Sequence, residues 1–216
     1  GIYSNIRKAI HYLLSCNIGE IFTIFVATLL NFGQMPLVPV QLLWLNLVTD
    51  SLPALALGVE PVEEGVMSQP PRDAHASLFA HGFAFRLAWQ GGMVGLLTLA
   101  AYFLGFTRLA APGLEGAAAN TMAFATLCLS RLFHGFNCKS GRPVLFTRAF
   151  WNNKFLLGAF AVGALLLAAV LLIPPLEPLF QVAELSIGLV GCIVGLAFGS
   201  MVVIQVLKAI RSMGKK

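Results

Sequence analysis

The sequence LLWLNLVTDSLP, residues 42–53, decides the fold because it places polar side chains inside an apolar helix. Asn46, Thr49 and Asp50 are spaced i, i+3 and i+4, which puts them on one face of a helix. Pro53 has no backbone N–H, so the carbonyl of Thr49, four residues earlier, loses its helical partner. The stretch therefore predicts a binding site within a membrane-like environment rather than a solvated surface.

A second polar set precedes this stretch. SCNIGE, residues 15–20, carries Asn17 and Glu20 three positions apart on one helical face. The short turn NFGQMP, residues 31–36, predicts a tight antiparallel pair of helices. Both polar sets lie about a dozen residues from that turn, so at about 1.5 Å per residue they reach a similar depth near the bilayer midplane. Two carboxylates and several neutral oxygens are expected to converge there.

Composition indicates a membrane protein. The chain is 58% hydrophobic and 11% charged, with a mean hydropathy of +0.83. A membrane-spanning helix needs about 20 apolar residues, and none of the apolar runs alternates as barrel strands do. We predict an all-α polytopic membrane bundle of six transmembrane helices, at residues 6–32, 37–58, 82–106, 117–137, 151–173 and 184–207.

The distribution of Lys and Arg predicts the orientation. With the N-terminus in the cytoplasm, only Arg108 falls in an outer connection, and Arg131 falls inside the fourth helix. The other cations then lie on the cytoplasmic side: Arg7, Lys8, Arg72, Arg86, Lys139, Arg142, Arg148, Lys154, Lys208, Arg211, Lys215 and Lys216. This bias accounts for the net charge of +5, so we expect contacts with lipid headgroups and no nucleic-acid partner. Both termini are predicted to be cytoplasmic.

The longest polar connection, residues 59–81, is also the acidic one. It contains three glutamates, an aspartate and three prolines, and the topology makes it cytoplasmic. It is either a solvated loop or a docking surface for a soluble domain.

Glycines recur in two of the predicted helices. Gly91, Gly92 and Gly95 lie in the third, and Gly191, Gly195 and Gly199 follow a four-residue spacing in the sixth. Small residues let helices approach closely in lipid, so we expect these glycines to serve packing.

The intramembrane carboxylates require compensation. On translocon scales a charged side chain at the bilayer centre costs roughly 2.5–3.5 kcal/mol. One interpretation is that Glu20 and Asp50 are protonated, or pair with Arg131, and only hold helices together. The other is a cation path, which the all-oxygen ligand set on a single hairpin favours. Such ligands suit Ca²⁺, but these side chains supply too few oxygens for a full shell, so further ligands must come from elsewhere.

Three motifs carry a family resemblance: SCNIGE, then PVQLLWLNLVTDSLPALALGVEP at residues 39–61, then PPR at residues 70–72. The chain resembles the C-terminal membrane half of P-type cation ATPases of the calcium-pump class. The resemblance covers essentially all of residues 1–216, as the fifth to tenth of the family's ten membrane helices. It implies that Asn17 and Glu20 are fifth-helix ligands, and that the sixth-helix ligands are Asn46, Thr49 and Asp50.

One departure from the family concerns the eighth helix. Sarcoplasmic-type pumps have a glutamate late in that helix that completes one of two calcium sites, whereas the segment here reads RLFHGFNCKSG, residues 131–141. Cys138 or Asn137 occupies that position. The resemblance therefore implies one transported Ca²⁺ per cycle. Arg131 is either a built-in positive charge near the vacated site or a side chain that snorkels to the cytoplasmic interface.

The resemblance also implies partners. The sequence contains no DKTG phosphorylation motif, so we expect no catalytic residue in this chain and no ATP hydrolysis by it alone. ATP and Mg²⁺ would act in the cytoplasmic phosphorylation, nucleotide and actuator domains of the same pump. The N-terminal membrane helices and the lipid bilayer are the other expected partners, and the plasma membrane is the expected location.

Two other function classes remain open at this point. A self-contained six-helix channel or secondary transporter would use the same intramembrane oxygens. A non-transporting membrane scaffold would use the charged groups only for helix packing.

Overall fold

The computed structural model describes residues 1–31, 33–62, 82–108 and 115–214. Throughout these ranges the regular structure is helical and contains no strand, which confirms the predicted all-α class. The elements in chain order are α1 (Ile2–Leu29), α2 (Pro39–Trp44), the π-helical η1 (Leu45–Thr49), α3 (Ser51–Gly58), α4 (Phe83–Arg108), α5 (Glu115–Cys138), α6 (Arg148–Trp151), α7 (Lys154–Leu172), the 3₁₀ helix η3 (Pro174–Leu176), α8 (Glu177–Phe180) and α9 (Ile187–Met213).

Five helices in the described ranges are long and apolar enough to cross a membrane: α1, the continuous segment Pro39–Gly58, α4, α7 and α9. The predicted span at 117–137 lies in α5, which is not among the five. Helix α5 contacts α1, α3, α4, α7 and α9, and nearly all of its side chains are buried. Because protein rather than lipid surrounds α5, its sequence tolerates polar residues that a lipid-facing helix would exclude.

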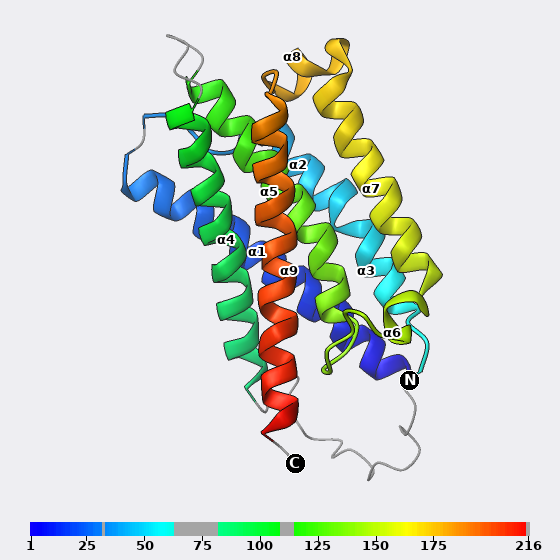
Figure 1. The fold of residues 1–216 in the computed structure, drawn as a ribbon. Coiled ribbons are helices and arrows are strands. Elements are labelled where there is room, and N and C mark those ends of the chain that lie inside the picture. The colour runs from blue at the N-terminus through cyan, green and yellow to red at the C-terminus, as the bar shows by residue number, and fades with distance from the viewer. Residues whose placement is uncertain (32, 63–81, 109–114, 215–216) are drawn as a thin grey trace.

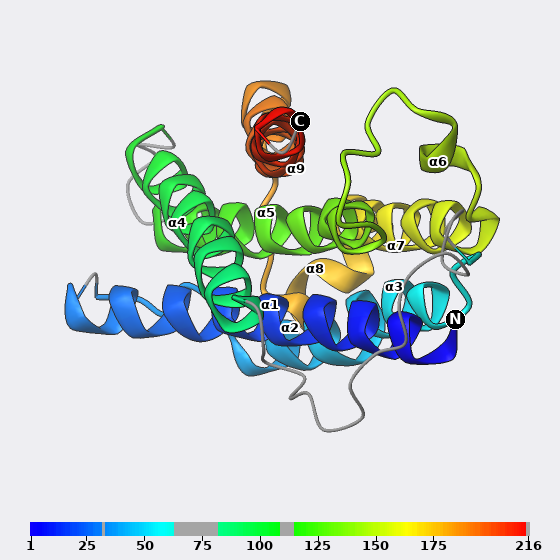
Figure 2. The ribbon, with the colours of Figure 1, turned by 90° about the horizontal axis from the view of Figure 1, so that it is seen from below.

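The helices form layers around α5 (Figures 1 and 2). Seen from below, α1 and the α2–α3 segment share one layer, α5 and α7 lie in the next, and α9 lies outermost (Figure 2). Helix α1 runs obliquely across the bundle, and both termini lie at the same end of it (Figure 1). This arrangement carries polar residues of α1, η1 and α5 into the interior.

Capping residues explain why α7 and α9 begin three residues later than the predicted ranges. Helix α7 begins at Lys154, where the Asn153 side chain accepts a hydrogen bond from the Leu156 N–H at 2.9 Å. Helix α9 begins at Ile187, after the N-cap Ser186. Asn and Ser are preferred N-caps because their side-chain oxygens satisfy free N–H groups of the first turn.

A buried polar cluster ties four segments together at the end of the bundle that holds the termini. Glu60 forms an ion pair with Lys139 at 3.4 Å, and its other carboxylate oxygen accepts from the Asn153 amide. Its backbone carbonyl accepts from the Asn5 amide at 2.8 Å. Burial lowers the pKa of Lys139, and the nearby carboxylate opposes that shift. Glu60 is therefore an anchor rather than a solvated acid; residues 63–81 of the predicted loop lie outside the described ranges.

The predicted glycine contacts are present at Gly91 and Gly95 of α4, but not at Gly92 or at the three α9 glycines. A Cβ atom on Gly91 would lie 2.6 Å from the Ser15 carbonyl oxygen, and one on Gly95 would lie 2.6 Å from the Phe22 ring. Helices α1 and α4 therefore pack with their backbones close together. A Cβ on Gly191, Gly195 or Gly199 would meet no described atom within 4 Å, so the packing interpretation of the α9 glycines is wrong for the described chain.

We expect Gly91→Ala to destabilise the domain by about 1–3 kcal/mol, because the added methyl group must push α1 away from α4. The measurement is the thermal unfolding midpoint of the purified protein in detergent. Gly92→Ala is the matched control, since a Cβ there meets nothing within 4 Å and alanine has the higher helix propensity. Equal midpoints for the two variants would refute the close approach.

Candidate cation site

The second membrane-spanning segment changes its hydrogen-bond pattern at the predicted site. Leu45–Thr49 form a π-helical turn, in which the Asp50 N–H donates to the Leu45 carbonyl at 3.0 Å. Pro53 follows shortly afterwards and cannot donate to the Thr49 carbonyl. Such π turns are rare and are found frequently at functional sites. Proline predicts the missing hydrogen bond, but the extra residue in the turn appears only in the structure.

Arg131 on α5 joins the two intramembrane carboxylates. Its Nη1 donates to Asp50 Oδ2 at 2.8 Å, and its Nη2 forms a short ion pair with Glu20 Oε2. Nη2 also donates to the Cys16 carbonyl at 3.2 Å. The Arg131 side chain is 0% exposed, which is inconsistent with snorkelling to the interface. The guanidinium is instead the buried partner of both acids, one of the arrangements that the sequence left open.

Asn46 approaches Glu20 from the other side. Its amide nitrogen donates to Glu20 Oε1 at 3.2 Å and to the Leu42 carbonyl at 2.9 Å. The Glu20 side chain is 13% exposed, whereas that of Asp50 is 3% exposed. Asn46 itself is exposed. Glu20 thus lies at the boundary between the buried guanidinium and the outer face of the α1–η1 pair.

The two remaining predicted ligands lie apart from this cluster. Thr49 is buried, and its hydroxyl lies 3.7 Å from the Cys128 thiol on α5. Asn17, one turn before Glu20, is exposed on α1. The single polar face predicted for residues 46–50 is therefore divided: Asn46 faces outward, while Thr49 and Asp50 face α5. The structure brings Glu20, Asn46 and Asp50 into one hydrogen-bonded group through Arg131.

Three buried oxygens, one on Asp50 and two on α5, have no hydrogen-bond partner in the described chain. They are Asp50 Oδ1 and the hydroxyls of Thr126 and Ser130 on α5. A buried acceptor without a donor costs roughly 1–3 kcal/mol. Asp50 Oδ1 therefore has an acceptor position that a cation could use, with the Tyr12 side chain as the neighbouring polar group. Thr126 and Ser130 were missed in the sequence, where their four-residue spacing just before Arg131 was the available signal.

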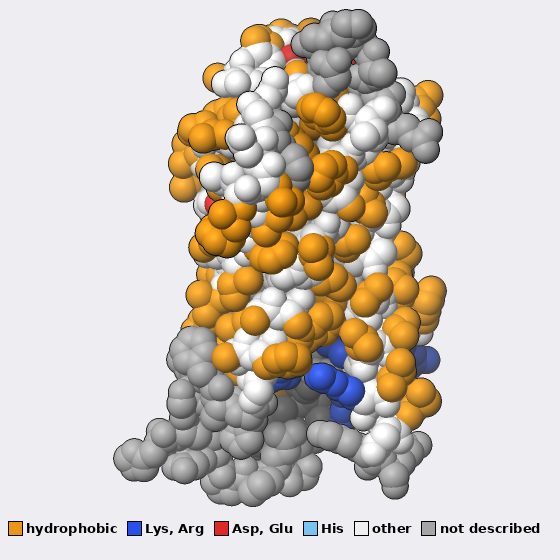
Figure 3. Space-filling view, turned by 90° about the vertical axis from the view of Figure 1, so that its left-hand side faces the viewer, with side chains coloured by type: hydrophobic (Ala, Val, Ile, Leu, Met, Phe, Trp, Pro, Cys, Tyr) orange, Lys and Arg blue, Asp and Glu red, His pale blue; other side chains and the backbone are white. Residues whose placement is uncertain are grey.

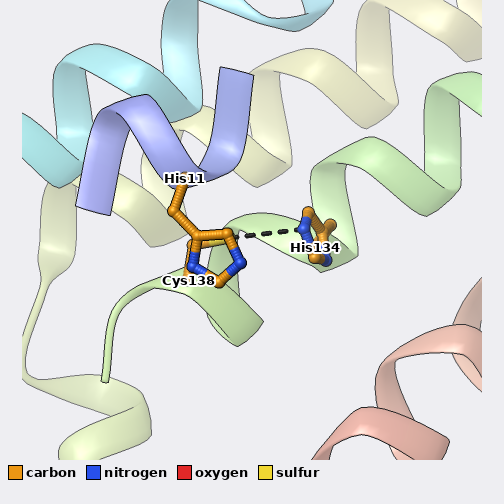
Figure 4. Close-up of side chains that lie close together, drawn as sticks. All are labelled: His11, His134 and Cys138. Carbon is orange, nitrogen blue, oxygen red and sulfur yellow. Dashed lines mark hydrogen bonds between the residues drawn. The ribbon is translucent and has the colours of Figure 1, made fainter. Parts of the chain in front are cut away.

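The accessory candidates Asn137 and Cys138 make their contacts further along α5. The Asn137 amide oxygen accepts from Gln205 at 2.8 Å, and its carbonyl accepts from Lys208, both on α9. Cys138 lies 3.3 Å from His134 (Figure 4). The Asn137 contacts link α5 to α9, and the Cys138 contact stays within α5; neither reaches the Glu20–Asp50 pair.

Ligand atoms of His11, His134 and Cys138 lie within 4.8 Å of one another (Figure 4). His11 Nε2 is hydrogen-bonded to Gln90 at 2.8 Å, and His134 Nε2 is hydrogen-bonded to Ser15 at 2.8 Å. The Nε2 atoms of both imidazoles have partners, whereas His134 Nδ1 is buried without one among the described residues. Because both Nε2 atoms are engaged, we interpret the cluster as hydrogen-bonded packing between α1, α4 and α5.

The family profile described as "Cation transporting ATPase, C-terminus" matches residues 34–210. The chain belongs to this family. The match includes the π turn, Asp50 and Arg131, but begins after Glu20.

Individual relatives of the chain extend the match to α1. The chain is 40% identical over 96% of its length to "Calcium-transporting ATPase 1" of Bacillus cereus, and 42% identical over 87% to a calcium-transporting ATPase of Bacillus subtilis. A calcium-transporting ATPase of Listeria monocytogenes is 31% identical over 98% of the chain, which includes Glu20. The chain spans 24%, 20% and 23% of these three relatives, so it corresponds to about a quarter of each.

Proposed function

We propose that this chain is the ion-translocating membrane domain of an ATP-driven calcium pump. The observation that carries the proposal is the meeting of Glu20 and Asp50 inside an apolar helical bundle, at a π turn, with one oxygen of Asp50 left without a partner. Names of relatives support the choice of ion, since those three proteins are named as calcium-transporting ATPases.

The proposed ligands are Asn17, Glu20, Asn46, Thr49 and Asp50. Carboxylate, carboxamide and hydroxyl oxygens are hard ligands, and Ca²⁺ takes six to eight of them at 2.3–2.6 Å. Asn17 and Asn46 are exposed next to Glu20, so the outer face of the α1–η1 pair is where further oxygens would complete the shell. We propose that the N-terminal membrane helices of the same pump supply them.

Arg131 supports a stoichiometry of one Ca²⁺ per cycle. Its guanidinium already contacts an oxygen of each carboxylate. With both acids ionised, the cluster carries one net negative charge, which one divalent cation more than neutralises. A second Ca²⁺ would find no further acid on the membrane-spanning helices that the structure describes. We propose that Arg131 holds the place of a second cation, with Asn137 and Cys138 as accessory residues on the same helix.

Energy coupling would come from outside this chain. We propose that ATP and Mg²⁺ act in the pump's cytoplasmic phosphorylation, nucleotide and actuator domains. The two termini lie at one end of the bundle (Figure 1), which supports a cytoplasmic location for both. The plasma membrane is the proposed location, with lipid around the bundle.

The test is acid-stable phosphorylation from ATP in native membranes, probed with an antibody against this chain. We expect a Ca²⁺-dependent phosphorylated band far heavier than 23.1 kDa, because the relatives are about four times as long as the chain. An antibody-positive band near the chain's own mass, without phosphate, would overturn the pump assignment. Ion flux by that shorter protein would then separate a channel or secondary transporter from a scaffold.

A further inference from the structure

A cavity of about 1140 Å³ opens at the end of the bundle that holds the termini, away from the Glu20–Asp50 cluster. Residues of α1, α4 and α9, and of the segment that follows α5, form its walls. Figure 3 shows basic side chains recessed in a hollow at the lower end of an otherwise apolar face.

The walls of this cavity are strongly basic. Six cationic side chains line it, and no described lining residue is acidic: Arg7, Lys8, Arg86, Arg142, Lys208 and Arg211. A concave surface lined by one sign of charge focuses the electrostatic potential and attracts ions of the opposite sign. The cavity therefore favours an anion.

Two N–H groups on α4, one from Arg86 and one from Trp89, have no hydrogen-bond acceptor within the described part of the protein. Arg86 and Trp89 both line the cavity, and the Nε atom of Arg86 and the Nε1 atom of Trp89 are buried without a hydrogen-bond partner. They lie three residues apart, on one side of α4. The Arg86 guanidinium also lies over the Phe83 ring, 5.8 Å from its centre, which restrains its orientation. A guanidinium and an indole N–H together suit a phosphate oxygen.

The position of the cavity favours a lipid source for that phosphate. It lies at the ends of three helices that are long and apolar enough to cross a membrane, which is the depth of headgroups. Phe85 and Leu207, 66% and 39% exposed, place apolar surface at its walls. Trp, Lys and Arg at such a level are typical of headgroup contacts.

We propose that this cavity binds a phosphate-bearing anion, supplied by the headgroup of an anionic phospholipid. The phosphate oxygens accept hydrogen bonds from the Arg86 guanidinium and the Trp89 indole, and Arg211 and Lys208 on α9 contribute positive charge. Binding there links α4 to α9. The site does not involve the carboxylates proposed for Ca²⁺, so the two proposals stand or fall separately.

The test uses the full-length protein, purified in detergent and stripped of lipid. Its thermal unfolding midpoint is titrated in three arms: phosphatidylglycerol, phosphatidylcholine and inorganic phosphate. We expect saturable stabilisation by phosphatidylglycerol that exceeds the effect of either other compound. Arg86→Gln and Arg211→Gln should each weaken the phosphatidylglycerol affinity roughly tenfold, since each removes a charge-assisted contact. Trp89→Phe keeps the aromatic bulk and should weaken it by a smaller factor.

Arg148→Gln is the matched control, because Arg148 is exposed and does not line the cavity; its affinity should equal that of the unsubstituted protein. Equal phosphatidylglycerol affinities for all variants would overturn the site. Saturable stabilisation by inorganic phosphate that matches phosphatidylglycerol and is lost in Arg86→Gln would overturn the lipid source and assign the cavity to a free anion. Ca²⁺-dependent phosphorylation, measured on the same preparations, reports on the calcium site independently.

Discussion

Asp50→Asn should weaken Ca²⁺ binding to the full-length pump on the order of 100-fold or more, because ligand charge tunes calcium affinity over several decades. Asparagine keeps the shape of the side chain but removes one of two intramembrane negative charges. It also leaves Arg131 with Glu20 as its remaining ionic partner. We therefore expect Asp50→Asn to lower the Ca²⁺ affinity more than the removal of a single neutral ligand would.

The measurement is Ca²⁺-dependent phosphorylation from ATP as a function of free Ca²⁺, together with direct ⁴⁵Ca²⁺ binding. Glu184→Gln is the matched control, since it removes the charge of an exposed acid next to α9 and should leave both curves unchanged. Expression level and monodisperse elution in detergent establish that Asp50→Asn inserts and folds. Retained high-affinity binding in a well-folded Asp50→Asn protein would contradict the ligand assignment.

Arg131→Met should destabilise the Ca²⁺-free protein by about 3–5 kcal/mol, the usual cost of removing one partner from a buried ion pair. The substitution leaves Asp50, which is 3% exposed, and Glu20, which is 13% exposed, without their common cation. Methionine fills most of the volume of the arginine side chain, so the expected loss of stability reflects the missing charge more than lost packing.

Calcium should reverse much of this loss. A cation that binds only the folded state stabilises it by mass action, and two unpaired carboxylates bind it more tightly than two paired ones. The shift of the unfolding midpoint with Ca²⁺ should therefore be larger for Arg131→Met than for the unsubstituted protein. The double variant Arg131→Met with Asp50→Asn should regain stability without Ca²⁺, since it removes one of the stranded charges. If Ca²⁺ shifts all three proteins equally, Arg131 is not coupled to the cation site.

Two outcomes separate the roles proposed for Arg131. If it only holds helices together, its loss should lower stability with no change in the calcium response. If Arg131 holds the place of a second cation, its loss should change both the stability and the shift of the unfolding midpoint with Ca²⁺. Arg131→Lys keeps the charge but loses the fork of donors that reaches two carboxylates at once, so we expect an intermediate result.

Local sequence was sufficient for the fold class, and it identified the polar residues of the two helices but not the direction in which each side chain points. Apolar runs of membrane-spanning length predict helices whatever their neighbours are, because every backbone polar group in lipid must be satisfied within the helix. The spacing of Asn46, Thr49 and Asp50 and the missing N–H of Pro53 are likewise local features. They predict the candidate site from local sequence alone.

Contacts between distant segments were decided by tertiary structure alone. Arg131 is 81 residues from Asp50 and 111 from Glu20 along the chain, and no periodicity distinguishes a paired guanidinium from one that snorkels. The glycines of α4 and α9 look alike in sequence, yet among these six only Gly91 and Gly95 of α4 lie close to another helix. The basic cavity similarly depends on α1, α4 and α9 meeting at one end of the bundle. Local sequence determines what each helix can bury, whereas the packing of helices determines which charge meets which.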